Sequence, residues 1–160
     1  MSRFVLALLI MGGLPALAAC QPAGNTVAAI ERSPAGLDQV PLTITTTSGK
    51  THSFTVEVAR TDAQQAQGLM NRETLAPDRG MVFPYEPPKP ASFWMKNTLI
   101  PLDIIFIRAD GTIARIEANT VPLSLDPVAS GEPIATVLEL AGGRAAELGI
   151  TPGAKVVWQR

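Results

Sequence analysis

Short runs in which hydrophobic and polar residues alternate dominate the chain from residue 40 to its end. In residues 42–47, Leu42 and Ile44 alternate with threonines, and residues 54–58 alternate in the same way after a turn at 48–50. Alternation with a period of two is typical of strands that bury one face, and β-branched residues fit such strands. The two runs therefore predict a β-hairpin.

The clearest local prediction is a second hairpin over residues 102–117. Two runs rich in β-branched residues flank Asp110-Gly111. An Asp-Gly pair in this setting is a strong hairpin signal, because a type I′ turn needs positive φ at both central residues. In the first run, residues 102, 104 and 106 are expected on one face. Asp103 then shares the other face with two isoleucines.

Two short helices are also predicted. Thr61-Asp62-Ala63-Gln64 has the form of a capping box, which predicts a helix from there to about Met70. Residues 142–148 predict a second helix, between strands at 136–140 and 155–158.

Residues 75–90 are rich in proline, and only residues 81–83 are expected to form a short strand. The prolines remove amide donors that a longer strand needs, which predicts a loop at the surface or at a sheet edge. The elements together predict a mainly β (α+β) fold: a mostly antiparallel sheet of six to eight strands, curled toward a barrel, with two short helices.

The first twenty residues have the pattern of a bacterial secretory signal. Arg3 is followed by an apolar run at 4–14 and by small residues at 16–19. Leu17-Ala18-Ala19-Cys20 resembles a lipobox, in which the cysteine thiol is alkylated by diacylglycerol and becomes the mature N-terminus. We predict a signal peptide over 1–19, lipidation at Cys20, a flexible tether over 20–40 and one β-rich domain over 41–160.

Two alternatives to lipidation stay open. In the first, the leader is an uncleaved membrane anchor, although its apolar run is shorter than the roughly 20 apolar residues that cross a bilayer. An ordinary signal peptidase that cuts after Ala18 or Ala19 leaves Cys20 as a free thiol. Lipidation is favoured because an exposed unpaired cysteine is a liability in an oxidising compartment. We expect an exported protein on the periplasmic side of a bacterial membrane, and Gln21, in place of Asp, favours the outer membrane.

Composition and charge exclude several classes of function. The 160 residues suit one domain, and 13 Lys and Arg against 14 Asp and Glu, without a run of like charges, make nucleic acid an unexpected partner. One cysteine and one histidine allow no disulfide and no multi-histidine zinc site, and no glycine-rich phosphate loop is present. We expect a monomer without a cofactor or a resident metal.

Several motifs resemble one protein family. They are Gly68-Leu69-Met70, Gly80-Met81-Val82-Phe83, the run from Phe93 to Asp103 (FWMKNTLIPLD), Glu139-Leu140-x-Gly142 and Gly149-Ile150-x-x-Gly153. Over residues 42–159 the chain resembles the family called domain of unknown function 192. The resemblance implies a compact β-rich domain, often behind a signal sequence, with no established activity or cofactor. One departure is Ala154, where the family commonly has an acidic residue.

The long motif and one later strand hold the candidate site residues. Asp103 lies among hydrophobic residues, so a buried carboxylate there must be paired or protonated. Lys96, Asn97 and Thr98 are its expected partners, and a structural network is favoured over a ligand site. Glu139 is a second candidate carboxyl. Trp94 follows the proline-rich loop, where an aromatic side chain suits the edge of a small-molecule pocket.

Three functions remain. The favoured one is a membrane-tethered, non-catalytic module that binds a small ligand or an envelope protein. The second is a hydrolase with Asp103 and Glu139 as acid and base, which requires the two carboxyl groups within about 10 Å of each other in one pocket. The third is a Cu(I) site whose ligands are thioethers and one imidazole beside an indole. Its residues are Met70, Met81, Met95, Trp94 and His52.

Overall fold

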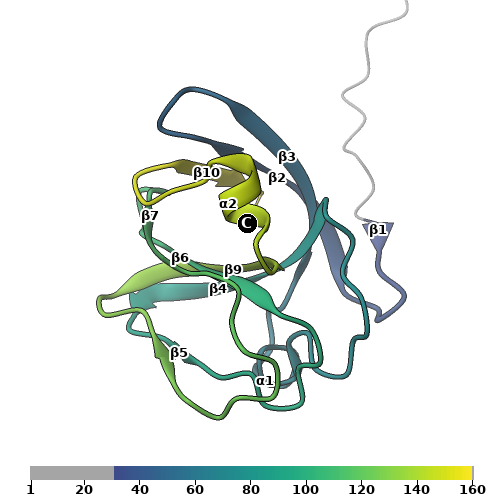
Figure 1. Cartoon of the computed structure of the whole chain (residues 1–160). Helices are drawn as coiled ribbons and strands as arrows, with labels where there is room; N and C mark the ends of the chain where they lie inside the picture. The colour runs from purple at the N-terminus through teal and green to yellow at the C-terminus, as the bar shows by residue number, and fades with distance from the viewer. Residues whose placement is uncertain (1–30, 160) are drawn as a thin grey trace, which may run out of the picture.

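The computed structural model describes residues 31–159, and its centre is a strongly curled β-sheet (Figure 1). Seven strands follow one path in the order β1 (Glu31–Arg32), β2 (Asp38–Thr45), β3 (Thr51–Val58), β4 (Arg79–Lys89), β9 (Ile134–Ala141), β6 (Leu102–Ile107) and β7 (Ile113–Glu117). All pairs are antiparallel except β3 with β4. The predicted mainly β, barrel-like fold is confirmed.

The last strand makes the sheet curl back on itself as a half-barrel. β10 (Lys155–Trp158) pairs with β2. Its Val156 amide also donates to the Gly111 carbonyl at 2.8 Å, in the turn that precedes β7. A separate two-stranded sheet consists of β5 (Ser92–Phe93) and β8 (Val128–Ala129).

Both predicted helices are present. α1 (Asp62–Gln67) begins with the predicted capping box: the Thr61 hydroxyl accepts from the Gln64 amide, and the Gln64 side chain accepts from the Thr61 amide. α2 (Arg144–Leu148) packs at the open end of the half-barrel (Figure 1). No helix in residues 31–159 is long and apolar enough to cross a bilayer.

The two predicted hairpins are confirmed, but the turn of the second one differs. β2 pairs with β3 and β6 with β7. Of Asp110 and Gly111 only the glycine has a positive φ, 84°, so the turn is not type I′. The Arg108 amide donates to the Thr112 carbonyl and closes a three-residue loop, and the Asp110 carboxylate accepts from the Thr112 amide at 2.8 Å.

The expectation that residues 75–90 form a loop or an edge is wrong. β4 runs from Arg79 to Lys89 in the middle of the sheet, between β3 and β9. Its pairing with β3 ends at Val82, so the prolines from Pro84 onward lie where no amide donor is needed on that side. The ladder with β9 is irregular between Pro84 and Lys89, which accommodates them there.

Strands are also present before residue 41. Within the predicted tether, β1 and the first residues of β2 pair with each other, and Gln39 and Val40 pair with β3. Pro34 and Gly36 occupy a tight turn in which the Gly36 amide donates to the Ser33 carbonyl. The predicted signal peptide over 1–19 and the predicted lipidation site Cys20 lie outside the described residues.

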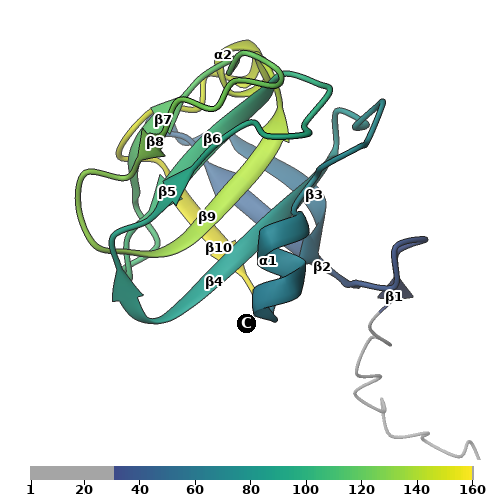
Figure 2. The ribbon, with the colours of Figure 1, turned by 90° about the horizontal axis from the view of Figure 1, so that it is seen from below.

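Two hydrophobic clusters pack against opposite faces of the same strands. The first fills the inside of the curl and includes Ile105, Leu138 and Leu140. The second lies on the outer face of β4, β9 and β6 and includes Phe83, Ile104 and Val137. Figure 2 shows α1 and β5 in front of this outer face. The second cluster therefore lies between the sheet and a cover made of loops and one helix.

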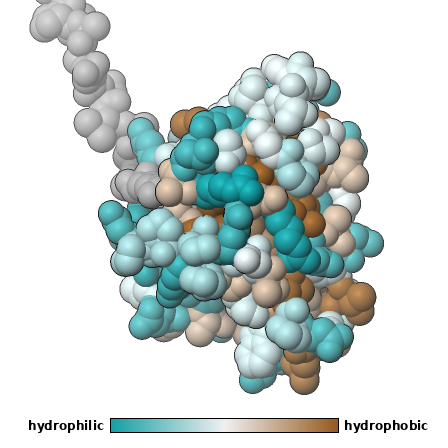
Figure 3. All heavy atoms as spheres, turned by 90° about the vertical axis from the view of Figure 1, so that its left-hand side faces the viewer, coloured by the Kyte–Doolittle hydropathy of each residue, from teal (hydrophilic) through white to brown (hydrophobic). Residues whose placement is uncertain are grey.

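The surface is mixed in polarity. Figure 3 shows a face that is mainly hydrophilic, with hydrophobic residues gathered in its lower right part. The large hydrophobic side chains exposed in the described part of the chain are Trp94, Leu99, Val121, Leu123, Leu125 and Val157.

Candidate functional site

Glu139 lies at the centre of the outer face of the sheet. Alternation along β9 places Leu138 and Leu140 inside the curl and turns Glu139 outward, under the cover. In the strand register Glu139 is opposite Met81 of β4 on one side and Ile104 of β6 on the other. Both neighbours belong to the hydrophobic cluster on that face. A carboxyl group is therefore held in an apolar layer.

The carboxyl group of Glu139 is not compensated by hydrogen bonds. The side chain is only 5% exposed, and its Oε2 has no hydrogen-bond partner in the described structure. Burial raises the pKa of Glu139 to about 8, and the positive charge of Arg72 opposes this shift. A buried polar atom without a partner is costly, so it points to a function or to a missing partner.

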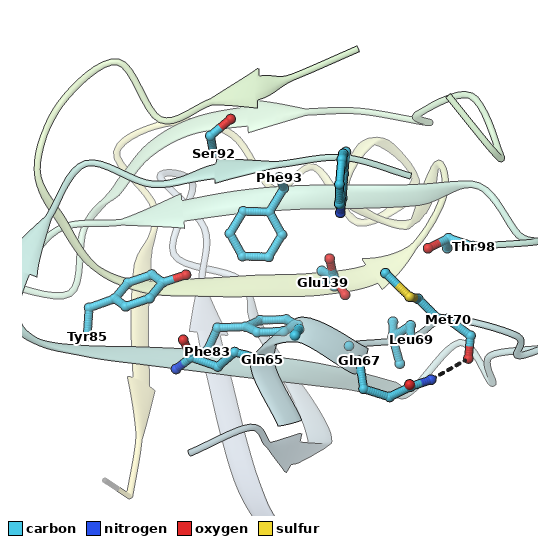
Figure 4. A pocket seen from close by; sticks show the side chains of 13 residues that line it. Gln65, Gln67, Leu69, Met70, Phe83, Tyr85, Ser92, Phe93, Thr98 and Glu139 are labelled. Carbon is cyan, nitrogen blue, oxygen red and sulfur yellow. Dashed lines mark hydrogen bonds between the residues drawn. The ribbon is translucent and has the colours of Figure 1, made fainter. Parts of the chain in front are cut away.

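A cavity of about 200 Å³ opens in front of Glu139. Figure 4 shows its carboxyl group between Phe93 on one side and Leu69 on the other, with Tyr85 and Met70 at the two ends. The walls come from α1 and the turn after it, from β4 and from the segment that starts at β5. Its lining residues include Gln65, Met70, Phe83, Tyr85, Phe93, Trp94 and Thr98.

Aromatic rings form much of the cavity wall. Phe93 packs edge-on against Phe83, with ring centroids 5.1 Å apart and planes at 82°. Trp94 is half exposed and forms part of the mouth. Burial and the nearby Glu139 raise the pKa of Tyr85 to about 12, so its hydroxyl stays protonated at all physiological pH values. The cavity thus combines one carboxyl group with four aromatic side chains.

Two loops that are far apart in sequence are joined at the mouth of the cavity. The Asn71 amide donates to the Asn97 carbonyl at 2.8 Å, and both asparagines have positive φ. Asparagine tolerates this left-handed conformation better than most residues. The motif residues 95–98 form a tight turn in which the Thr98 amide donates to the Met95 carbonyl. This turn brings Thr98 to the cavity, while Lys96 and Asn97 are exposed.

Arg72 neutralises a different carboxylate. Its guanidinium donates to both oxygens of Glu57, at 2.8 and 2.6 Å. In the parallel ladder Glu57 is opposite Met81, which is itself opposite Glu139. Glu57 and Glu139 therefore face the same side of the sheet, two strands apart. The positive charge of Arg72 acts on both of them. The group of three carries a net negative charge when Glu139 is ionised.

Asp103 has a structural position on the opposite face. Its carboxylate is fully buried and accepts three backbone amides, from Asn119 and Gly143 at 2.8 Å and from Ala145 at 2.7 Å. The prediction that Lys96, Asn97 and Thr98 are its partners is wrong, because these residues lie in the turn beside the cavity. Asp103 instead ties the loop after β7 to the start of α2.

The two carboxyl groups do not form a catalytic pair. In the β6–β9 ladder Asp103 is opposite Leu140, and Glu139 is opposite Ile104. Neighbouring residues of a strand point to opposite faces, so Asp103 points into the curl and Glu139 points outward. The hydrolase alternative based on these two residues is thereby overturned.

The five residues named for a copper site do not converge either. Met81 and Met95 are buried core residues, and the Met95 sulfur accepts from the Thr120 hydroxyl at 3.1 Å. His52 lies on the same face of β3 as Phe54 and Val56, which face the inside of the curl, whereas Met81 lies on the outer face. Within residues 31–159, no three His, Cys, Asp or Glu side chains are grouped so as to hold a metal ion.

Of the candidate residues, Trp94, Thr98 and Glu139 thus meet at one cavity, and Lys96 lies beside it with its ammonium group 5.1 Å from the centroid of the Trp94 ring. Tyr85, Phe93 and Gln65 were not predicted. The available signal was their position in the sequence. Phe93 is part of the long motif and directly precedes Trp94, and Tyr85 follows the Gly80–Phe83 motif by two residues.

Two solved structures resemble the chain closely. A protein of unknown function from Novosphingobium aromaticivorans DSM 12444 is 50% identical, with a TM-score of 0.78, and the match covers 82% of this chain and 94% of that one. A protein from Sinorhizobium meliloti 1021, described as a "putative transcription regulator", is 44% identical, with a TM-score of 0.75, and the match covers 76% of this chain and 95% of that one. No curated protein matches the chain.

A family model matches residues 43–158, which include every strand that surrounds the cavity and all of the motifs named above. The model is that of domain of unknown function 192, described as an uncharacterized ACR. The chain therefore belongs to the domain of unknown function 192 family.

Proposed function

We propose that this protein is a membrane-tethered module of the bacterial envelope that binds a small ligand, without turnover, in the cavity in front of Glu139. The observation that carries the proposal is the buried Glu139 carboxyl, whose Oε2 has no partner in the described structure and which faces a cavity. A ligand that hydrogen-bonds to this oxygen supplies the missing partner.

Binding is favoured over catalysis by the groups that line the cavity. Glu139 is the only carboxyl among the lining residues, and no imidazole or thiol joins it. Acid and base catalysis of the two-carboxyl type has no second group there. The volume of about 200 Å³ lies below the roughly 300–1,000 Å³ of pockets for drug-sized ligands, so the ligand is small.

A nucleic-acid ligand is not favoured, although one relative is described as a transcription regulator. The chain has 13 Lys and Arg against 14 Asp and Glu, whereas nucleic-acid surfaces are basic. The cavity also presents a carboxyl group, which repels phosphate when it is ionised.

The first prediction concerns where small molecules bind. We expect a library of small polar compounds, spanning cations, anions and neutral molecules at about 1 mM, to yield compounds that bind the full chain in a non-ionic detergent. Their NMR chemical-shift changes are expected to concentrate at Phe93, Trp94 and Thr98. Truncation of Trp94 to alanine removes part of the cavity mouth and is expected to weaken binding by about fivefold or more, since an aromatic contact contributes about 1 kcal/mol.

Leu125→Ala is the matched control, because Leu125 is also an exposed hydrophobic residue but does not line this cavity. Binding by this variant is expected to equal that of the wild type. If no compound perturbs the cavity residues, or if Trp94→Ala and Leu125→Ala bind equally well, the cavity is not the functional site.

The second prediction concerns the tether. Expressed in a Gram-negative host, the full chain is expected in the membrane fraction, with a diacylglyceryl adduct on its mature N-terminus by mass spectrometry. Two acyl chains give stable anchoring, whereas a protein with none stays in the aqueous phase. Cys20→Ser is therefore expected to move the protein to the soluble periplasmic fraction. Equal distribution of the two proteins, or an unmodified Cys20, contradicts the lipid anchor.

A further inference from the structure

Three side chains that line the cavity donate hydrogen bonds to backbone carbonyls of the protein. The Gln65 side-chain amide nitrogen donates to the carbonyls of Ala59 and Pro84, both at 3.2 Å. The Gln67 amide nitrogen donates to the Met70 carbonyl at 3.4 Å, as the dashed line in Figure 4 shows, and the Thr98 hydroxyl donates to the Lys96 carbonyl at 3.3 Å. These donors are already used within the protein. The Glu139 Oε2, in contrast, has no hydrogen-bond partner in the described structure.

When Glu139 is ionised, Arg72 does not compensate its negative charge. The positive charge of Arg72 lowers the pKa of Glu139, but both terminal nitrogens of Arg72 donate to Glu57. An occupant with a positive charge pairs with the ionised carboxyl group of Glu139. An anion meets repulsion from the ionised Glu139, and a hard metal ion requires six or more oxygen ligands, whereas the cavity has one carboxyl group.

The aromatic walls suit an organic cation. Rings attract ammonium groups over their faces, and aromatic walls with a nearby acid are a known arrangement for amines and quaternary ammonium groups. Two rings of this cavity already hold ammonium groups of the protein: Lys89 lies over Tyr85, with its Nζ 4.6 Å from the ring centroid, and Lys96 lies over Trp94. The volume of about 200 Å³ equals that of roughly seven liquid waters, which is room for a cation of a few carbon atoms.

We infer that the ligand of this cavity is a small organic monocation, a primary amine or a quaternary ammonium compound, held by Glu139 and the aromatic rings around it. The inference rests on the proposed function and specifies the class of its ligand.

The test compares probes of nearly equal shape that differ in charge. Tert-butylammonium and tetramethylammonium are the cations, tert-butanol is the neutral probe and pivalate is the anion. Each is titrated into the full chain in a non-ionic detergent near pH 8, the pKa of Glu139, while the chemical shifts of the cavity residues are followed. We expect at least one cation to bind about tenfold or more tightly than tert-butanol, and pivalate to bind most weakly.

Glu139→Gln and Glu73→Gln separate the site from its surroundings. Glu139→Gln keeps the shape of the side chain without its charge, and is expected to reduce cation affinity about tenfold or more while leaving tert-butanol unchanged. Glu73→Gln removes the same charge from an exposed position next to Arg72, and is expected to bind the cations like the wild type. Unfolding curves of both variants verify that they are folded.

The outcomes distinguish the two proposals. If tert-butanol shifts the cavity residues at the same concentration as the cations, the cavity binds small ligands and the inference of a cation is overturned. If cations bind equally well to Glu139→Gln, or if neither cation perturbs the cavity, the inference is also overturned, and the compound library then decides whether the cavity binds anything.

Discussion

Replacement of Asp103 by alanine is expected to lower the free energy of unfolding by about 3–5 kcal/mol, because it leaves three backbone amides, one of them in a fully buried bond, without their charged acceptor. The carboxylate is fully buried and accepts from Asn119, Gly143 and Ala145. Hydrogen bonds to a charged group contribute more than neutral ones, and unpaired buried donors carry a further penalty. Urea denaturation followed by tryptophan fluorescence measures the loss.

Two further variants separate hydrogen bonding from packing. Asp103→Asn keeps the volume, but its amide nitrogen must face at least one backbone N–H, so a loss of about 2–3 kcal/mol is expected. Asp126→Ala is the control, since Asp126 is an exposed acid whose removal is expected to change stability by no more than about 0.5 kcal/mol. A loss below about 1 kcal/mol for Asp103→Ala contradicts the structural role assigned to this residue.

The partners of Asp103 show where sequence reasoning reached its limit. Alternation in β6 correctly placed Asp103 on the face of Ile105 and Ile107, and the need for partners followed from burial. The partners themselves come from the loop after β7 and from the start of α2, which are 16 to 42 residues away along the chain. Backbone amides carry no sequence signature, so nearby polar side chains were the only candidates that the sequence offered.

The position of β4 illustrates a different limit. Prolines exclude a strand only where both of its edges need backbone amide donors. Whether both edges need donors depends on how far the neighbouring strands extend. β3 stops pairing at Val82, before the prolines begin. The local sequence of β4 cannot predict where this pairing ends, because the end is set by β3, a strand 20 to 30 residues earlier. The hairpins and the capping box were predictable because their hydrogen bonds are local.

The cavity was predicted only in part for the same reason. Trp94 and Glu139 were both candidates, but their meeting depends on β9 pairing between β4 and β6 and on α1 lying over that face. The long motif indicated where one wall begins. The second wall, from Gln65 to Met70, could not be placed from the sequence, since the helix that carries it has no buried residues of its own.

The free energy of unfolding is expected to fall as the pH rises from about 5 to 8, and Glu139→Gln is expected to remove about 3–5 kcal/mol of that fall. Below its ordinary pKa of 4.5, Glu139 is protonated in both the folded and the unfolded chain. Between 4.5 and about 8, the folded chain keeps a proton that the unfolded chain has released, so stability decreases with pH. Above about 8 both forms are ionised and this contribution is constant.

Urea denaturation at several pH values measures the difference between the wild type and the variant. Near pH 5 the two proteins are expected to agree within about 1 kcal/mol, because both side chains are neutral when folded. Near pH 8 the variant is expected to be the more stable one. Glu73→Gln, which changes an exposed acid, is expected to keep the wild-type slope. Parallel curves for the wild type and Glu139→Gln contradict a raised pKa at Glu139.

A gain in stability from Glu139→Gln has a consequence for the proposed site. Near pH 8, a neutral amide of the same shape fits an apolar layer better than an ionised carboxylate whose Oε2 has no partner, so stability alone does not account for a glutamate there. Residues that lower stability are often kept for function. The same substitution is expected to raise stability near pH 8 and to weaken cation binding. The two effects in one variant identify the buried charge of Glu139 as the group that the ligand neutralises.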